Sequence, residues 1–158
     1  MRSDTRRRVR ASGLTAAALS LTVLLLSGCG GGERLAHTCS ATDRQFIRTA
    51  GLNLTAIGSA GREYLAGELK AKDVIEDAKR ASLALERTNP SDPSLRRTRP
   101  LMGAMFTEYG RAIRARERNG DAGRHMHRAY GLANFARDIL VEAQAELEER
   151  GCDVRELL

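Results

Sequence analysis

Residues 122–150 read AGRHMHRAYGLANFARDILVEAQAELEER, preceded by Asp121 and followed by Gly151. The apolar residues of this stretch recur at alternating intervals of three and four, the spacing of a helix with one face against a neighbour. They are Met126, Ala129, Ala133, Ala136, Leu140, Ala143 and Leu147. Because many of them are alanines, an adjacent helix can pack closely. The stretch therefore predicts a long helix, capped by Asp121 and stopped by Gly151.

Three more helices are expected before it, over residues 40–67, 71–88 and 93–118. Ser40 and Asp43 resemble a capping box at the start of the first, and Gly67 ends it. Asp92-Pro93 predicts a cap followed by proline in the first position of the third. Pro100 either kinks that third helix or marks its true start. The fold class that we predict is all-α, an up-down-up-down four-helix bundle.

The N-terminus has the pattern of an export signal. Arginines within residues 2–10 are followed by an uncharged apolar run, Leu14–Leu26. The run is too short to span a bilayer, which takes about 20 residues, but it fits the apolar region of a signal peptide. It ends in Leu26-Ser27-Gly28-Cys29, which is followed at once by three glycines.

Leu26-Ser27-Gly28-Cys29 matches the lipobox motif, and in this region the chain resembles bacterial lipoproteins. The resemblance implies that the signal peptide, residues 1–28, is cut off and that the Cys29 thiol carries a diacylglyceryl group. Residues 29–38 then form a tether and 39–158 the helical domain, held on the extracytoplasmic face of the cell membrane. The alternatives are an ordinary signal peptide cut elsewhere or an uncleaved anchor. We favour Sec export over a twin-arginine route, and 23 arginines against 3 lysines suggest a GC-rich Gram-positive source.

The two remaining cysteines, Cys39 and Cys152, bracket the helical domain. An even number of antiparallel helices brings the residue before the first helix and the residue after the last to the same end. In an oxidising compartment an even number of cysteines favours a disulfide. We therefore predict a Cys39–Cys152 disulfide, with free thiols or intermolecular pairing as the alternatives.

The charge balance argues against nucleic acid as a partner. The chain has a formal net charge of +6, but residues 1–28 contribute five arginines against one acid. The remainder holds 21 basic and 19 acidic residues, so the predicted mature domain has no strong basic excess.

Motifs of known catalytic sites are missing from the sequence. There is no Gly-x-Ser-x-Gly, phosphate loop, His-Glu-x-x-His or Cys-x-x-Cys, and we expect neither an enzyme nor a cofactor. His125 and His127, with Met102 and Met105 on the preceding helix, are weak candidates for a copper site. Residues two apart on a helix point about 200° apart, however, so these histidines could not chelate one ion together.

Arg111, Arg114 and Arg118 share one helix face within the basic stretch 94–128. This surface could bind anionic lipid, a wall polymer or an acidic protein. The alternative, which we favour, is a solvated face whose arginines pair with acids on adjacent helices. The acids considered for that pairing are Glu142, Glu146 and Glu149.

Tyr64, Tyr109 and Tyr130 could place their hydroxyls near a cavity between helices that takes a small apolar ligand. The commoner alternative is core tyrosines with satisfied hydroxyls.

The function predicted from the sequence is a membrane-anchored, extracytoplasmic helical module without catalytic activity. Its partners would be the membrane, through lipid on Cys29, and an envelope protein or anionic polymer. The alternative function is a carrier or sensor that binds a small ligand or a copper-like metal in or near the bundle.

Overall fold

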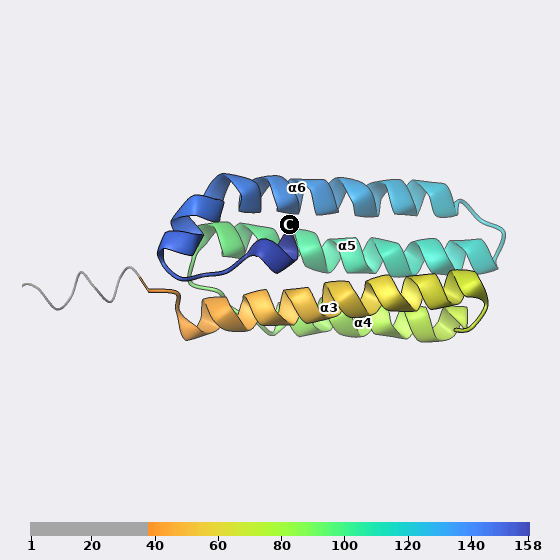
Figure 1. The fold of residues 1–158 in the computed structure, drawn as a ribbon. Helices are drawn as coiled ribbons and strands as arrows, with labels where there is room; N and C mark the ends of the chain where they lie inside the picture. Colours follow the sequence, from red (N-terminus) through yellow and green to blue (C-terminus); the bar gives the residue numbers. More distant parts are fainter. Residues whose placement is uncertain (1–37) are drawn as a thin grey trace, which may run out of the picture. The chain divides into compact units, whose positions relative to one another are not determined.

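The computed structural model describes residues 38–158, which contain four long helices and a short 3-10 turn (Figure 1). The helices are α3 (Ala41–Ala66), α4 (Ala71–Glu86), α5 (Pro93–Glu117) and α6 (Ala122–Glu149), and the turn is η1 (Arg155–Leu157). None of these helices is long and apolar enough to cross a membrane. The predictions for the signal peptide, for Cys29 and for nearly all of the tether lie outside the described residues.

Capping side chains mark the starts of α3, α5 and α6, and the boundaries of all four helices agree with the predicted ones to within two residues. The Ser40 side chain accepts the N–H of Asp43, and Gly67 ends α3 in the left-handed region with φ 80°. Asp92 caps α5, while Asp121 accepts the Arg124 N–H at the start of α6. Because α5 begins at Pro93 and includes Pro100, Pro100 does not mark the start of the helix.

Successive helices are antiparallel and form the predicted up-down-up-down bundle. The α5–α6 contact is the most extensive, α4 packs on α5, and α3 packs mainly on α4. Figure 1 shows α5 between α6 and the α3–α4 pair. Helices α3 and α6 do not pack closely along their lengths. One side of the bundle is therefore left for other parts of the chain to fill.

Most of the large core side chains lie toward one end of the bundle. Phe46 near the start of α3, Leu85 at the end of α4 and Leu95 at the start of α5 are fully buried. Leu140 and Leu147 in the second half of α6 join them. The opposite end has a smaller buried cluster of Ala60, Ala71, Val74 and Ile113. Since alanine fills less volume than leucine or phenylalanine, this second end is the more thinly filled of the two.

The Cys39–Cys152 disulfide is present, and it joins the two points that were expected to meet. Both cysteines are buried, and the Cα atoms are 5.0 Å apart. Beyond Cys152 the chain folds back against α3, where Val154 and Leu157 are buried. This C-terminal tail, residues 153–158, occupies the space between α3 and α6 at the disulfide end of the bundle.

A polar cluster supports the same end. The Asp43 carboxylate accepts the N–H groups of Ser91 and Asp92 at 2.6 and 3.0 Å. Asp92 in turn accepts Arg150 at 2.6 Å, so α3, α5 and the end of α6 are linked through buried carboxylates. Burial acts to raise the pKa of Asp43, but these backbone hydrogen bonds and one from Ser40 outweigh it and lower the pKa.

The disulfide is expected to be a large part of the domain's stability. The cysteines are 113 residues apart in sequence, and in the chain-entropy model a loop of that size stabilises by roughly 4 to 5 kcal/mol. We expect the Cys39→Ser/Cys152→Ser variant to lose about that much in the free energy of unfolding, as measured by urea denaturation. Equal denaturation midpoints for the oxidised protein and the double variant would contradict this role.

Candidate binding pocket

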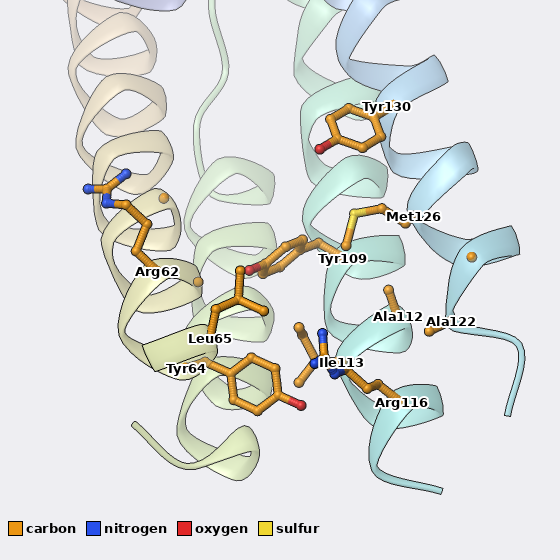
Figure 2. A pocket seen from close by; sticks show the side chains of 13 residues that line it. Arg62, Tyr64, Leu65, Tyr109, Ala112, Ile113, Arg116, Ala122, Met126 and Tyr130 are labelled. Atoms are coloured by element: carbon orange, nitrogen blue, oxygen red, sulfur yellow. The ribbon is translucent and has the colours of Figure 1, made fainter. Parts of the chain in front are cut away.

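A pocket of about 420 Å³ lies between α3, α5 and α6, at the end of the bundle away from the disulfide (Figure 2). Its α3 wall includes Gly58, Gly61 and Leu65, and its α6 wall includes Met126. Ile113 of α5 lines it as well. The pocket exists because the C-terminal tail fills only the other half of the space between α3 and α6, and because small residues line this half.

All three tyrosines of the chain line this pocket, one from each helix: Tyr64 from α3, Tyr109 from α5 and Tyr130 from α6. The sequence left open whether they face a cavity or are satisfied in the core. Tyr130 is 65% exposed at the rim, while Tyr64 and Tyr109 are half-buried. The structure thus gathers on one pocket three residues that are far apart in the sequence.

The Tyr64 hydroxyl has a partner. It donates to Glu117 Oε1 at 2.8 Å, and the Arg116 guanidinium lies 5.7 Å from the centre of its ring. The hydrogen bond to Glu117 raises the pKa of Tyr64, with a smaller contribution from burial. The ring, the cation and the carboxylate form one ordered group at the mouth of the pocket.

The Tyr109 hydroxyl has no hydrogen-bond partner among residues 38–158. Burial raises the pKa of Tyr109, and the nearby Tyr130 adds to the shift. Its ring reaches across to α3, where the hydroxyl takes the place that a side chain at position 61 would need. A Cβ on Gly61 would overlap the hydroxyl oxygen, so glycine is what allows Tyr109 to reach α3 here.

The charged residues that line the pocket are Arg62 and Arg116, and no carboxylate is among the lining residues. Arg62 is anchored on α3 by a 3.0 Å hydrogen bond to Ser59. Two cations and a free hydroxyl on otherwise mainly apolar walls suit a ligand that is largely apolar and carries an acceptor or a negative charge. Neither arginine was among the candidate residues predicted from the sequence.

The predicted arginine surface lies elsewhere. Arg111 and Arg114 line a shallow groove between α4 and α5, and Arg118 is the C-cap of α5. Arg111 pairs with Glu108 on its own helix. Glu142, Glu146 and Glu149 lie toward the opposite end of α6, so the proposed pairing with these acids is wrong. Within residues 38–158 neither Arg114 nor Arg118 has an ion-pair partner.

The two histidines are separated as the helical geometry predicted. His125 contacts Glu108 Oε2 through Nδ1 at 2.7 Å, whereas His127 is exposed. Met102 is buried in the core, not beside them as a ligand. In the part of the chain that the structure describes, no group of three or more His, Cys, Asp or Glu residues could hold a metal ion.

Comparison of the chain with protein-family models, with curated proteins and with solved structures found no match. The pocket and the N-terminal pattern are therefore the features that bear on function.

The contact between Gly61 and Tyr109 can be tested with a double-mutant cycle. In the natural background Gly61→Ala should lower the free energy of unfolding by about 1 to 3 kcal/mol, because the added methyl displaces the Tyr109 ring. In a Tyr109→Phe background the nearest remaining ring atom is Cζ at 3.5 Å, an ordinary contact. In the Tyr109→Phe background Gly61→Ala should leave the free energy of unfolding unchanged or raise it by up to about 1 kcal/mol, because alanine has a higher helix propensity than glycine. Urea denaturation of the four proteins measures the coupling, and equal effects in both backgrounds would contradict it.

The buried Glu108 should make stability depend on pH. The hydrogen bond from His125 outweighs desolvation and, with Arg111, lowers the pKa of Glu108 from its usual 4.5. Its stabilising contribution is therefore complete above about pH 4.5 and is lost as the pH falls through the lower folded value.

At pH 7 we expect Glu108→Gln to lower the free energy of unfolding by about 1 to 3 kcal/mol, because the charged hydrogen bonds to a buried carboxylate are lost. The difference from the natural protein should shrink below pH 4.5, as followed by urea denaturation at several pH values. Glu142→Gln, at an exposed position, is the control and should show neither effect. A Glu108 difference that stays constant with pH would refute the assignment.

Proposed function

We propose that the protein is a lipid-anchored, extracytoplasmic binding module without catalytic activity, whose helical domain takes a small ligand in the pocket between α3, α5 and α6. The observation that carries this proposal is the convergence of Tyr64, Tyr109 and Tyr130 on one mainly apolar pocket. Apolar walls with a few polar groups that fix orientation are typical of small-molecule sites, and about 420 Å³ is within their usual size.

The lipid anchor in this proposal rests on the resemblance of the N-terminus to bacterial lipoproteins. The order of basic region, apolar run, Leu26-Ser27-Gly28-Cys29 and glycines supports export and acylation of Cys29. Two acyl chains would hold the protein at the membrane stably, which a single chain does not. The Cys39–Cys152 disulfide agrees with an oxidising compartment.

One observation supports the alternative function, which is an interaction surface for an anionic polymer or an envelope protein. Arg114 and Arg118 are exposed, and neither is neutralised by a carboxylate within residues 38–158. We place it second because exposed arginines on a helix are usually solvated, whereas the pocket brings three tyrosines from three helices onto mainly apolar walls. The copper version of the carrier is not retained, because Glu108 engages His125 and the two histidines diverge.

The chain offers a direct optical test. It has no tryptophan, and its three tyrosines all line the pocket, so its intrinsic fluorescence reports on the pocket itself. We expect the uncharged probe N-phenylnaphthylamine to quench this emission by energy transfer when added to the full-length protein in phosphatidylcholine vesicles.

Gly58→Leu should weaken this quenching by about tenfold or more, because the new side chain occupies the pocket. A Cβ at position 58 meets only the flexible end of Arg62, at 3.6 Å, so the variant should fold. Gly131→Leu on α6 adds the same side chain to a helix where it meets nothing within 4 Å, and it should leave quenching unchanged. Absence of quenching in the natural protein, or equal quenching in Gly58→Leu, would overturn the proposed function.

A further inference from the structure

We propose that one face of α6 binds a second copy of this chain, with the two α6 helices antiparallel across a twofold axis at Phe135. The inference goes beyond the proposed function, because none of the residues of this face lines the pocket between α3, α5 and α6. Three observations support it: the exposure of the face, its symmetric spacing about Phe135, and the opposite charges of its two halves.

Helix α6 has a face that no other part of the described chain covers. It lies at the edge of the bundle and packs on α5, without extensive contact to another helix (Figure 1). Phe135 is at the middle of α6 and points about 100° away from the buried Ala136 beside it, so its side chain is 67% exposed. A single exposed ring does not define an interface, so the residues around it decide.

The residues that share this face form a stripe along α6, here called the Phe135 stripe. Its members are Arg124, Arg128, Gly131, Phe135, Ile139, Glu142 and Glu146. They are exposed except for Gly131 and Ile139, which are partly buried. Their spacings are four, three, four, four, three and four, which keeps all of them within about 40° of Phe135 around the helix. This spacing is the same in both directions from Phe135, as a twofold axis at that residue requires.

The charges of the Phe135 stripe are opposite in its two halves. Arg124 and Arg128 precede Phe135, and Glu142 and Glu146 follow it at the same distances. An antiparallel second copy therefore places Glu142 opposite Arg128 and Glu146 opposite Arg124, and the twofold axis repeats each pair. A parallel copy would place like charges together, so the charges select the antiparallel arrangement.

The inner charges of the stripe are available for this contact. Within residues 38–158 neither Arg128 nor Glu142 has an ion-pair partner. The outer charges are partly engaged near the ends of α6, since Arg124 pairs with Asp121 at 3.2 Å and Glu146 lies 3.5 Å from Arg150. We therefore assign the specificity of the contact to Arg128 and Glu142.

The order of the charges along α6 favours a contact with another helix over a solvated face. Arg124 and Arg128 are four residues apart, as are Glu142 and Glu146. Like charges at this spacing destabilise an isolated helix, whereas a helix face that is only solvated typically alternates charges of opposite sign. The repulsion within each half would be relieved by the opposite charges of a second α6.

Gly131 fits a close approach of two helices. Glycine lowers the stability of a helix interior relative to alanine. A Cβ at position 131 would meet nothing within 4 Å, so packing inside residues 38–158 does not require glycine there. In the antiparallel pair Gly131 faces Ile139 of the second copy, beside the two Phe135 rings, and the missing side chain lets the helices approach. The contact then has an apolar centre and charged ends, as protein interfaces commonly do.

The test is a charge exchange, with dimerisation of the full-length protein measured by sedimentation equilibrium in a density-matched non-ionic detergent. Arg128→Glu places a glutamate opposite Glu142 at both ends of the contact and should weaken the dimer by about tenfold or more. Glu142→Arg should have the same effect. The combined variant Arg128→Glu/Glu142→Arg should dimerise about as tightly as the natural protein. Positions 128 and 142 are about 21 Å apart along one helix, so a contact within one copy cannot restore the dimer.

A second pair of variants tests the apolar centre. Phe135→Ala should weaken the dimer by about tenfold or more, because aromatic side chains at the middle of an interface carry much of the binding energy. Leu52→Ala is the matched control, since Leu52 is 66% exposed on α3, and it should leave dimerisation unchanged. Both substitutions are at exposed positions, so the urea denaturation midpoint of each variant should stay close to the natural value.

Three results would count against the proposal. The first is a natural protein that is entirely monomeric at about 100 µM. The second is a dimer that the charge exchange fails to restore, and the third is an equal loss in Phe135→Ala and Leu52→Ala; either would place the contact on another surface. None of these results changes the expected quenching by N-phenylnaphthylamine, so this inference and the proposed function fail independently.

Discussion

The packing of the C-terminal tail between α3 and α6 is the constraint on which the rest of the domain depends. The disulfide ties Cys152 to the start of α3, so the tail must leave from that end, and Val154 and Leu157 are buried there. Together with Phe46, Leu95 and the leucines of α6, they give this end most of the large buried side chains, each contributing about 1.5 to 3 kcal/mol. With the tail between them, α3 and α6 do not close on each other, and the far half of the bundle keeps an open pocket.

The open half is nevertheless ordered, because its aromatic residues have fixed positions. Tyr109 reaches α3 only because position 61 is glycine, and Tyr64 is held by Glu117 and Arg116. These contacts replace the leucine packing of the other end and leave space between them. Stability and binding are thus divided along the bundle: the disulfide end holds the fold together, and the other end can hold a ligand without loss of the main core.

Local signals made the fold predictable. Gly67, Asp92-Pro93 and Asp121 define helix ends through hydrogen bonds and backbone preferences that act within a few residues. The pocket depends instead on which faces meet. The tyrosines were singled out as a set, but the role of Gly61 requires the register of α3 against α5. Arg116 was passed over for the face of Arg111, Arg114 and Arg118, yet a position two residues from Arg114 points about 200° away, toward the pocket.

The position of the C-terminal tail connects the disulfide to the pocket. Leu157 and Leu158 line a smaller cavity between α3, α5 and α6 at this end, and η1, which follows Cys152 after a short segment, contacts α3. A three-residue turn has little helical stability of its own, so its position depends on burial of Val154 and Leu157 and on the disulfide beside them. The covalent link that stabilises the bundle therefore also keeps the tail between α3 and α6, and with it the separation of α3 from α6 on which the pocket at the other end depends.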